Sequence, residues 1–238
     1  GMLDSQGNAV LRESTGGGKT FTTVTVDDTK GYAMRQVFES PDDEAFYGLG
    51  QHQSDEFNYK GKNETLLQYN TKVSVPFILS NKNYGILWDN YSLSRFGDKR
   101  PYSDLDKAFK LYNRDGKENS LTATYYNDQK GREVLQTREE PVIDYDDLGT
   151  IKNFPDKFPT NESSATWEGE LEPLESGKYH FRLHYAGYTK VFLGDEEIIP
   201  ERWRTAWNPN QYKVAVELEK GKRYPLRIEW LPDGAVSY

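Results

Sequence analysis

The chain has 238 residues and a net charge of −8, with 35% hydrophobic residues, 14% aromatic residues and no cysteine. This length suits one large β domain or two small ones, each able to bury a core. The acidic balance argues against nucleic-acid binding, the lack of cysteine excludes disulfides and thiolate metal sites, and no apolar run approaches the 18 residues of a membrane-spanning helix.

The first elements predicted along the chain are a loop and two strands. Three consecutive glycines make Arg12–Gly18 a loop, and the β-branched run Phe21–Val26 predicts a strand. Asp27–Gly31 has the composition of a turn, and Tyr32–Phe38 is strand-like again. The 17 Tyr residues of the chain agree with β structure, because aromatic rings pack well on a pleated surface.

The stretch Phe46–Phe96 is the most distinctive part of the first half. It begins with a turn that contains Gly48 and Gly50, followed by a polar loop at Gln51–Gly61. A Leu/Gln/Asn run, two strands and the turn between them come next: Leu66–Asn70, Val75–Leu79, Tyr84–Trp88 and Asn81–Asn83. Asp89 after the second strand is interpreted as a strand-end or turn residue.

This order of features resembles the N-terminal β-sandwich domain of glycoside hydrolase family 31, especially that of its bacterial α-xylosidases. The resemblance implies that the loop with Gly48, Gly50, Gln51 and His52 reaches toward the mouth of a catalytic barrel and shapes a sugar subsite. The alternative is an ordinary strand-to-loop turn. Either way, both glycines permit backbone shapes that other residues rarely adopt.

No catalytic residue is assigned in this chain. The family places its nucleophile and acid in a (β/α)₈ barrel, and the sequence has no alternation of strands and helices that could build one. The resemblance therefore implies a part of a retaining α-xylosidase that is inactive by itself, and the catalytic barrel of the whole enzyme becomes an expected partner.

A change in composition predicts a domain boundary near residue 101. Residues 104–118 are rich in charge and turn residues, and we assign residues 1–100 to a partial sandwich and residues 101–238 to a second domain with its core at 119–238. The segment Ser103–Tyr112 could form a short helix, with Ser103 as N-cap and Asp106 in its first turn.

The second half has the clearest period-2 alternation. Apolar and polar residues alternate in three segments separated by glycine turns, which indicates antiparallel strands with one buried face. The apolar positions are Tyr179, Phe181, Leu183 and Tyr185, then Tyr212, Val214, Val216 and Leu218, then Tyr224, Leu226, Ile228 and Trp230. His180 and His184 fall on the opposite face of the first segment, where a solvated polar face is expected.

Residues 119–238 resemble the β module named after the anthrax protective antigen. The matching segments are Leu121–Tyr126, Trp167–Leu171, Gly177–Leu183, Lys190–Asp195 and Gly221–Trp230. The resemblance implies a glycan-binding module inserted in the sandwich. The expected fold is thus all-β: a partial antiparallel sandwich of the galactose-mutarotase type, followed by a protective-antigen-type barrel or sandwich.

Neither a metal nor a cofactor is expected. Calcium-dependent relatives of the module carry two adjacent Asp where this chain has Tyr185–Tyr188, so calcium-dependent lectin activity is not predicted. The string Asp144–Gly149 fails as an EF-hand, because its twelfth position is Pro155 rather than a bidentate Glu.

The best candidate for sugar binding is the segment Glu201–Tyr212, interpreted as a polar loop between strands. Trp203 and Trp207 would stack on sugar faces, while Arg204 and Asn208 would donate to hydroxyl groups. Tyr188 is predicted at the same rim. The alternative is that one of these tryptophans plugs the end of the barrel. Trp167 and Trp230 are assigned to the core, because both stand in strand-like contexts.

Three functions remain open at this point: part of an α-xylosidase whose module holds long substrates such as xyloglucan pieces, a self-sufficient carbohydrate-binding or adhesin protein, and a structural spacer. The expected partners are a xyloglucan-type oligosaccharide and a catalytic barrel, with self-association through unpaired strand edges. We expect a periplasmic or secreted location in a bacterium, although the composition also suits the cytoplasm.

Overall fold

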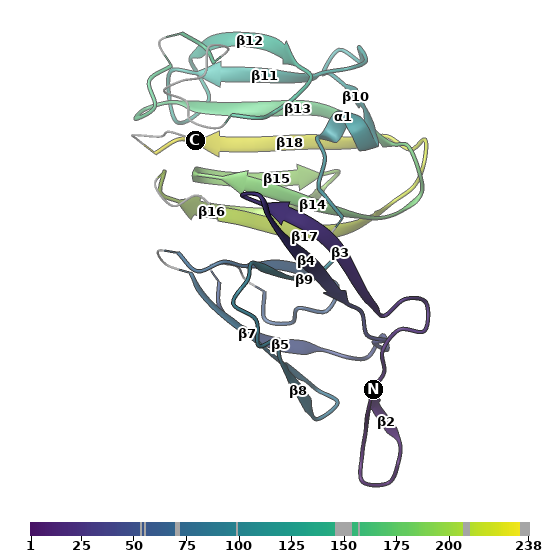
Figure 1. The fold of residues 1–238 in the computed structure, drawn as a ribbon. Helices are drawn as coiled ribbons and strands as arrows, with labels where there is room; N and C mark the ends of the chain where they lie inside the picture. The colour runs from purple at the N-terminus through teal and green to yellow at the C-terminus, as the bar shows by residue number, and fades with distance from the viewer. Residues whose placement is uncertain are drawn as a thin grey trace. The chain divides into compact units, whose positions relative to one another are not determined.

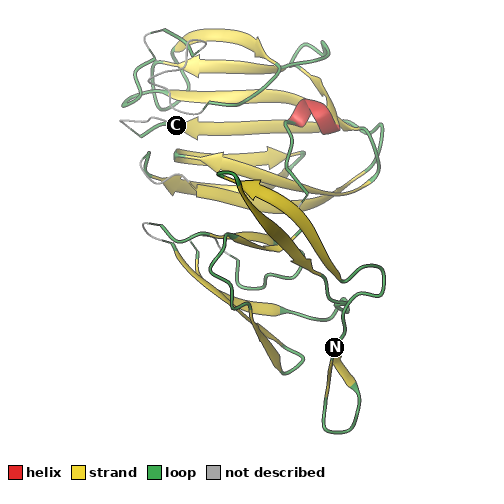
Figure 2. Ribbon diagram, viewed as in Figure 1, coloured by secondary structure: helices red, strands yellow, loops and turns green. Residues whose placement is uncertain are grey.

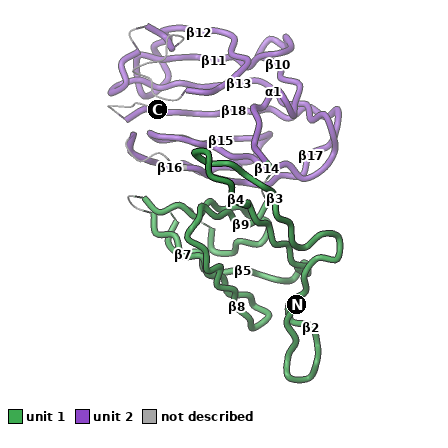
Figure 3. The backbone as a smooth tube through the Cα atoms, viewed as in Figure 1, with its two compact units in different colours: residues 1–100 green, residues 101–238 purple. Residues whose placement is uncertain are grey.

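The computed structural model describes residues 1–238 except 53, 55, 70–71, 99, 146–153, 157, 207–209 and 234–238. Strands dominate it, and a single four-residue helix is found among the described residues (Figure 2). The chain divides into two compact units, residues 1–100 and residues 101–238 (Figure 3). Nowhere in the described chain is a helix long and apolar enough to cross a membrane.

Unit 1 contains four small antiparallel sheets, β1–β2, β3–β4, β5–β7–β8 and β6–β9. Their strands are β1 (Met2–Leu3), β2 (Ala9–Leu11), β3 (Lys19–Val26), β4 (Thr29–Gln36), β5 (Phe46–Gln51), β6 (Asn63–Leu66), β7 (Val73–Ser80), β8 (Tyr84–Leu87) and β9 (Ser94–Gly97).

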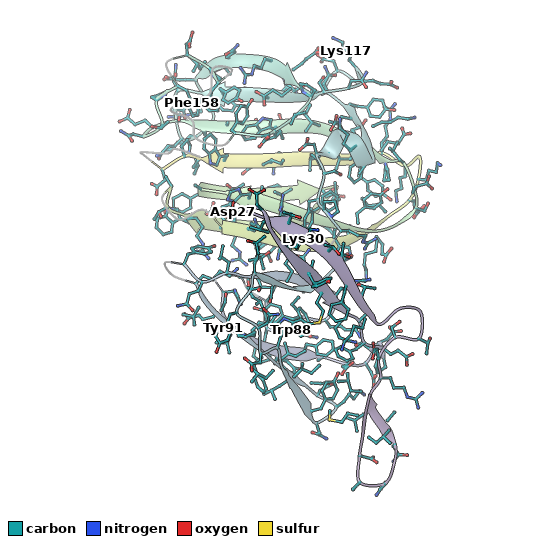
Figure 4. All side chains as sticks on the ribbon, viewed as in Figure 1. Asp27, Lys30, Trp88, Tyr91, Lys117 and Phe158 are labelled. Carbon is teal, nitrogen blue, oxygen red and sulfur yellow. The ribbon has the colours of Figure 1, made fainter. Side chains whose placement is uncertain are left out.

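The hairpin β3–β4 confirms the two strands that β-branched composition predicted, with a tighter turn. Its register runs from Lys19↔Gln36 to Val26↔Thr29, so the predicted turn Asp27–Gly31 is too long. Asp27 and Asp28 form the turn alone, at φ 46° and 63°. Two central residues at positive φ match the twist of a hairpin, which lets the second strand begin at once. Figure 4 labels Asp27 and Lys30 at the tip.

Unit 1 has a small core. Leu49, Tyr59 and Ile78 are buried together, and the partly buried Phe96 packs edge to face with both Tyr59 and Phe46. The side chains of β3, by contrast, are all exposed.

Unit 2 is a sandwich of a seven-stranded and a two-stranded antiparallel sheet. The large sheet has the order β12–β11–β13–β18–β15–β16, with β10 also paired to β13, and Figure 1 shows this order. The small sheet is β14–β17. The strands are β10 (Phe109–Tyr112), β11 (Leu121–Tyr126), β12 (Val134–Glu140), β13 (Ser164–Pro173), β14 (Gly177–Tyr185), β15 (Gly187–Leu193), β16 (Glu196–Arg204), β17 (Asn210–Leu218) and β18 (Tyr224–Leu231).

The predicted helix Ser103–Tyr112 is wrong at both ends. Helix α1 covers only Leu105–Ala108, its N-cap is Asp104 rather than Ser103, and that cap makes no side-chain hydrogen bond. From Phe109 onward the chain is strand β10, which pairs with β13. Phe109 and Leu111 are buried in the core of the sandwich, and this burial outweighs the local helix signal.

The core of unit 2 has two parts, of which the first lies between the two sheets and the second lies between the large sheet and the segment that contains Phe154 and Phe158. One part is mainly aliphatic and includes Leu111, Leu171 and Ile199. The other is aromatic: Tyr125, Trp167 and Trp230 pack with Phe158. Trp167 and Trp230 are only 4% and 9% exposed, which confirms that they belong to the core. The alternation predicted along β14, β17 and β18 places the expected apolar residues on this inner side.

Candidate functional site

Two aromatic rings lie side by side on the outer face of the large sheet of unit 2. Tyr188 on β15 and Trp203 on β16 are cross-strand partners, and their ring centroids are 6.2 Å apart with the planes tilted by 43°. They are 37% and 43% exposed. We call Tyr188 and Trp203 the aromatic pair. The structure therefore brings together two of the predicted sugar-contacting residues.

The aromatic pair is held by its strands and by one hydrogen bond. The indole Nε1 of Trp203 donates to Asp233 Oδ2 over 2.7 Å. Behind Tyr188, Gly187 has φ 76°, and a Cβ there would stand 2.3 Å from the Leu231 carbonyl oxygen. Only glycine allows this close approach of β15 to β18. Rings fixed in this way lose little conformational freedom when a ligand stacks on them.

The predicted loop Glu201–Tyr212 is wrong in extent. Strand β16 continues to Arg204 and β17 begins at Asn210, so Trp203 is a strand residue rather than a loop residue. Arg204 Nη1 donates to the carbonyl oxygen of Trp203 over 3.1 Å, and the Arg202 guanidinium lies 5.0 Å from the centroid of the Tyr212 ring. Trp207 and Asn208 lie outside the described residues.

The turn where calcium-dependent relatives carry two Asp contributes no carboxylate. Tyr185 and Ala186 are buried, and the carbonyl oxygen of Ala186 accepts a 2.7 Å hydrogen bond from Trp230 Nε1. Among the described residues no group of three or more His, Asp or Glu side chains is placed to hold a metal ion. The Asp144–Gly149 string lies partly outside the described residues.

In unit 1 the predicted Gly48 and Gly50 flank Leu49 in β5, and all three residues have a positive φ. Gly48, Leu49 and Gly50 have φ 116°, 64° and 98°, and the pairing of β5 with β7 shifts by a bulge at this point. A Cβ on Gly48 or Gly50 would stand 2.5 or 2.2 Å from a carbonyl oxygen of β7. This bulge directs the side chain of Leu49 into the core, where Leu49 is 2% exposed.

Gln51 and His52 follow this bulge and differ in burial. Gln51 is exposed and pairs with Val73 of β7. The His52 side chain is 3% exposed, its Nε2 lies 2.8 Å from the carbonyl oxygen of Leu49, and its Nδ1 lies 3.8 Å from Glu64 Oε1. Lys72 Nζ is 2.6 Å from the same carboxylate oxygen. His52 is thus built into the local structure, whereas Gln51 faces solvent.

A buried carboxylate in each unit escaped the sequence analysis. In unit 1, Glu44 accepts hydrogen bonds from the hydroxyls of Ser80 and Tyr84 over 2.5 Å and of Ser40 over 2.6 Å. Burial raises the pKa of Glu44, but these hydrogen bonds favour the charged form and leave the pKa lowered. Burial, and then the bond to Glu44, raise the pKa of Tyr84 to about 12.

In unit 2 the corresponding group is Glu140. Its Oε1 accepts from the Tyr125 hydroxyl and from Arg138 Nε, each over 2.6 Å, and its Oε2 accepts from Trp167 Nε1 over 2.7 Å. Burial, followed by the bond to Glu140, raises the pKa of the Tyr125 hydroxyl well above its usual range. Glu44 just before β5 and Glu140 at the end of β12 are acidic residues in polar surroundings, so no sequence signal marks either group.

Other predicted positions have simple structural explanations. His180 and His184 are exposed along β14, in agreement with the predicted polar face. Asp89 is exposed directly after β8, as expected for a strand-end residue.

Comparison with known proteins gives a match for each unit. Residues 117–236 match the family model of the PA14 domain, and residues 2–96 match that of the glycosyl hydrolase 31 N-terminal galactose mutarotase-like domain. A GH31 α-xylosidase from Xanthomonas citri has a solved structure with a TM-score of 0.84 and 38% sequence identity, covering 98% of this chain and 25% of that chain.

Two curated relatives match shorter segments. An α-xylosidase from Saccharolobus solfataricus is 46% identical over 78 residues, which cover 29% of this chain. An uncharacterized family 31 glucosidase from Pseudescherichia vulneris is 41% identical over 59 residues, or 25% of this chain. The matched segments span 11% of each relative. The chain therefore belongs to the PA14 domain family through its second unit, and its first unit is a galactose mutarotase-like N-terminal domain of glycosyl hydrolase family 31.

Proposed function

We propose that this chain is the non-catalytic N-terminal part of a family 31 enzyme that acts on α-xylosides, and that its PA14 domain binds oligosaccharides of the substrate. The ligand class is xyloglucan-type. The observation that carries the proposal is the aromatic pair, two rings fixed 6.2 Å apart on adjacent strands with more than a third of each side chain exposed. Planar rings held in this way suit the apolar faces of sugars.

The first unit supports the same proposal from another direction. The bulge at Gly48–Gly50 requires glycine at both of these positions for steric reasons, and it leaves Gln51 exposed at the end of β5. We propose that this segment contributes to the edge of the substrate pocket beside a catalytic barrel. A periplasmic or secreted location would bring such an enzyme to its polymer-derived substrates.

An exposed apolar surface supports the barrel or another part of the enzyme as a partner. Phe21, Val26 and Tyr32 on the hairpin β3–β4 are 61%, 66% and 74% exposed. An exposed apolar ribbon of this kind favours contact with another protein surface. Sedimentation velocity of the chain alone tests the alternative of self-association: a monomer at high concentration would exclude it.

Calorimetric titration with xyloglucan oligosaccharides tests the sugar-binding proposal. We expect a dissociation constant between about 1 µM and 1 mM for the native chain and no measurable heat for Trp203→Ala. Tyr91→Ala is the matched control, because Tyr91 is a fully exposed aromatic residue of unit 1. Equal binding by the native chain and Trp203→Ala would refute the role of the aromatic pair, and absence of binding by both would favour the spacer function.

A further inference from the structure

A concave feature separate from the aromatic pair lies on the large sheet of unit 2. It is an open cleft of about 830 Å³, lined by residues of the turn after β10, of β13, of the turn after β15 and of β18. Its main polar side chains are Arg114, Asp115, Glu168, Glu170, Asp195 and Arg227. We call this feature the charged cleft.

The register of the sheet places the charged cleft on the same face as the aromatic pair. Along β15, Tyr188, Lys190 and Phe192 alternate with the buried Thr189, Val191 and Leu193. Side chains two residues apart share a face, so Phe192 in the cleft and Tyr188 in the aromatic pair both point outward. Phe192 lies four positions after Tyr188 along β15, which corresponds to roughly 13 Å.

The two features lie at opposite ends of that face. Tyr188 is at the start of β15 and pairs with Leu231 at the end of β18, whereas the cleft contains Pro225 and Arg227 at the start of β18. Figure 4 labels Lys117, which follows the turn of the cleft, at one end of the sheet and Phe158 at the opposite end. Between the two sites, Lys190 Nζ lies 3.1 Å from Glu229 Oε2.

The walls of the charged cleft are rigid turns. In the turn after β10, the buried side chain of Asn113 accepts backbone hydrogen bonds from Asp115 and Lys117 through Oδ1, over 3.0 and 2.9 Å. On the other side, Gly194 has φ 62° and its N–H donates to the carbonyl oxygen of Pro225 over 2.7 Å. A cleft with fixed walls requires little reorganisation to bind a ligand.

Both arginines of the cleft have partners that hold them in place. Arg114 Nη1 donates to Glu168 Oε2 over 3.2 Å. The Arg227 guanidinium lies 4.3 Å from the centroid of the Phe192 ring, and its Nη1 is 3.0 Å from Glu229 Oε1. The side chains of Arg114 and Arg227 are about half exposed, at 58% and 47%, so both remain accessible to a ligand.

These groups favour a neutral polyhydroxylated ligand. Arginines offer several N–H donors and carboxylates offer several lone pairs, and a sugar hydroxyl both donates and accepts hydrogen bonds. The four carboxylates of the cleft face its two guanidinium groups and that of Arg223, whose Nη1 lies 3.4 Å from Glu170 Oε2, so a phosphate or sulfate would meet net repulsion. The geometry points to a second sugar subsite in the charged cleft, and we infer that one extended oligosaccharide occupies both the cleft and the aromatic pair.

This inference rests on the proposed sugar binding by the aromatic pair, and ligands of two lengths test it separately. The probes are the α-xylosyl-glucose disaccharide, which is too short to reach both sites, and a xyloglucan tetradecasaccharide, each titrated into the 238-residue chain. The cleft variant is Arg114→Ala with Glu168→Gln, which removes both members of one surface ion pair. Its matched control is Lys220→Ala with Glu175→Gln, an exposed surface pair at 3.5 Å whose residues do not line the cleft.

We expect the native chain to bind the longer probe more tightly than the shorter one, because the second contact is intramolecular. The cleft variant should lose roughly tenfold in affinity for the tetradecasaccharide, as expected for lost hydrogen bonds to charged groups. Its affinity for the disaccharide and its thermal unfolding should match those of the control.

Three other results have distinct meanings. Unchanged tetradecasaccharide affinity in the cleft variant, together with loss in Trp203→Ala, would overturn the inference and support the proposed function. Binding that survives Trp203→Ala but disappears in the cleft variant would support the cleft and overturn the aromatic pair. Absence of binding of either probe to the native chain would overturn both.

Discussion

The two units of this chain bury apolar side chains to very different degrees. Unit 2 has one cluster of nine buried residues and a second of six, whereas the cluster of unit 1 has three. Unit 1 instead exposes large apolar side chains on β3–β4, such as Phe21, Val26 and Tyr32. Since each buried apolar Å² contributes about 25 cal/mol, most of the apolar stabilisation lies in unit 2.

Polar contacts are correspondingly more important in unit 1. The buried carboxylate of Glu44 connects Ser40 before β5 with Ser80 of β7 and Tyr84 of β8. In unit 2 the similar network around Glu140 only adds to an aromatic core that is already packed. Unit 2 therefore has a large buried core of its own, whereas unit 1 depends on few buried groups and on backbone geometry.

The largest expected effect is on the core of unit 2. Leu171 is 0% exposed near the end of β13, and Leu171→Ala should lower the free energy of unfolding by about 3–5 kcal/mol, since it removes apolar contacts and leaves a cavity. Urea denaturation of the chain measures this loss.

Leu174→Ala is the matched control for that change, because Leu174 is 41% exposed and close in sequence. Its cost should stay below about 0.5 kcal/mol. A loss of less than about 1 kcal/mol for Leu171→Ala would contradict the assignment of the dominant core to unit 2.

The next effect tests the backbone geometry of unit 1. Gly50→Ala should cost roughly 2–4 kcal/mol, since φ 98° is unfavourable for alanine and its Cβ would stand 2.2 Å from the Val73 carbonyl oxygen. Gly61→Ala separates the two causes, because Gly61 has φ 71° and a Cβ added there would have no other atom within 4 Å.

The control variant should therefore lose only about 1–2 kcal/mol. Hydrogen exchange of peptides from β5 and β7, measured by mass spectrometry, reports the stability of this region. Equal protection in the two variants would show that the contact with β7 relaxes and that the bulge is not constrained by packing.

The sequence predicts the regular strands of this fold well and its long-range contacts poorly. Alternation alone locates β14, β17 and β18 and their inner faces, because each pattern is complete within one strand. Trp167 and Trp230 are assigned correctly to the core for the same reason. Local signals fail at Ser103–Tyr112, where pairing of Phe109–Tyr112 with β13 replaces the helix.

The candidate sites show the same limit. Tyr188 and Trp203 come together because their strands pair, although the sequence suggested a loop for Trp203. The charged cleft draws residues from four separate segments, and no short motif connects them. Glu44 and Glu140 resemble surface acids in the sequence, since their burial depends on partners up to 40 residues away.

A smaller loss of stability is expected when the buried carboxylate of unit 2, Glu140, is replaced. Glu140→Gln should cost about 2 kcal/mol, because the amide cannot accept all three hydrogen bonds and leaves Arg138 without its carboxylate. Glu139→Gln is the matched control: Glu139 is the neighbouring residue, and its exposed pair with Lys117 is worth less than about 0.5 kcal/mol. Similar urea midpoints for both variants would contradict a structural role of the network.

The smallest expected effect is the acid sensitivity of unit 1. The pKa of Glu44 is lowered from 4.5, because its hydrogen bonds with Ser40, Ser80 and Tyr84 outweigh the opposing effect of burial. The unfolded chain therefore binds a proton more readily than the folded one, so this contribution is complete above pH 4.5 and is lost as the pH falls through the folded pKa. Calorimetric scans from about pH 6 to about pH 3 should show the transition of unit 1 falling in temperature, and Leu171→Ala identifies that transition by leaving it in place.

Glu44→Gln should lower this transition at neutral pH and flatten its acid dependence, whereas Glu39→Gln, a change of an exposed residue next to Ser40, should preserve the native slope. An unchanged slope in Glu44→Gln would mean that other carboxylates control the acid response, and the proposed dependence of unit 1 on this polar network would then be wrong.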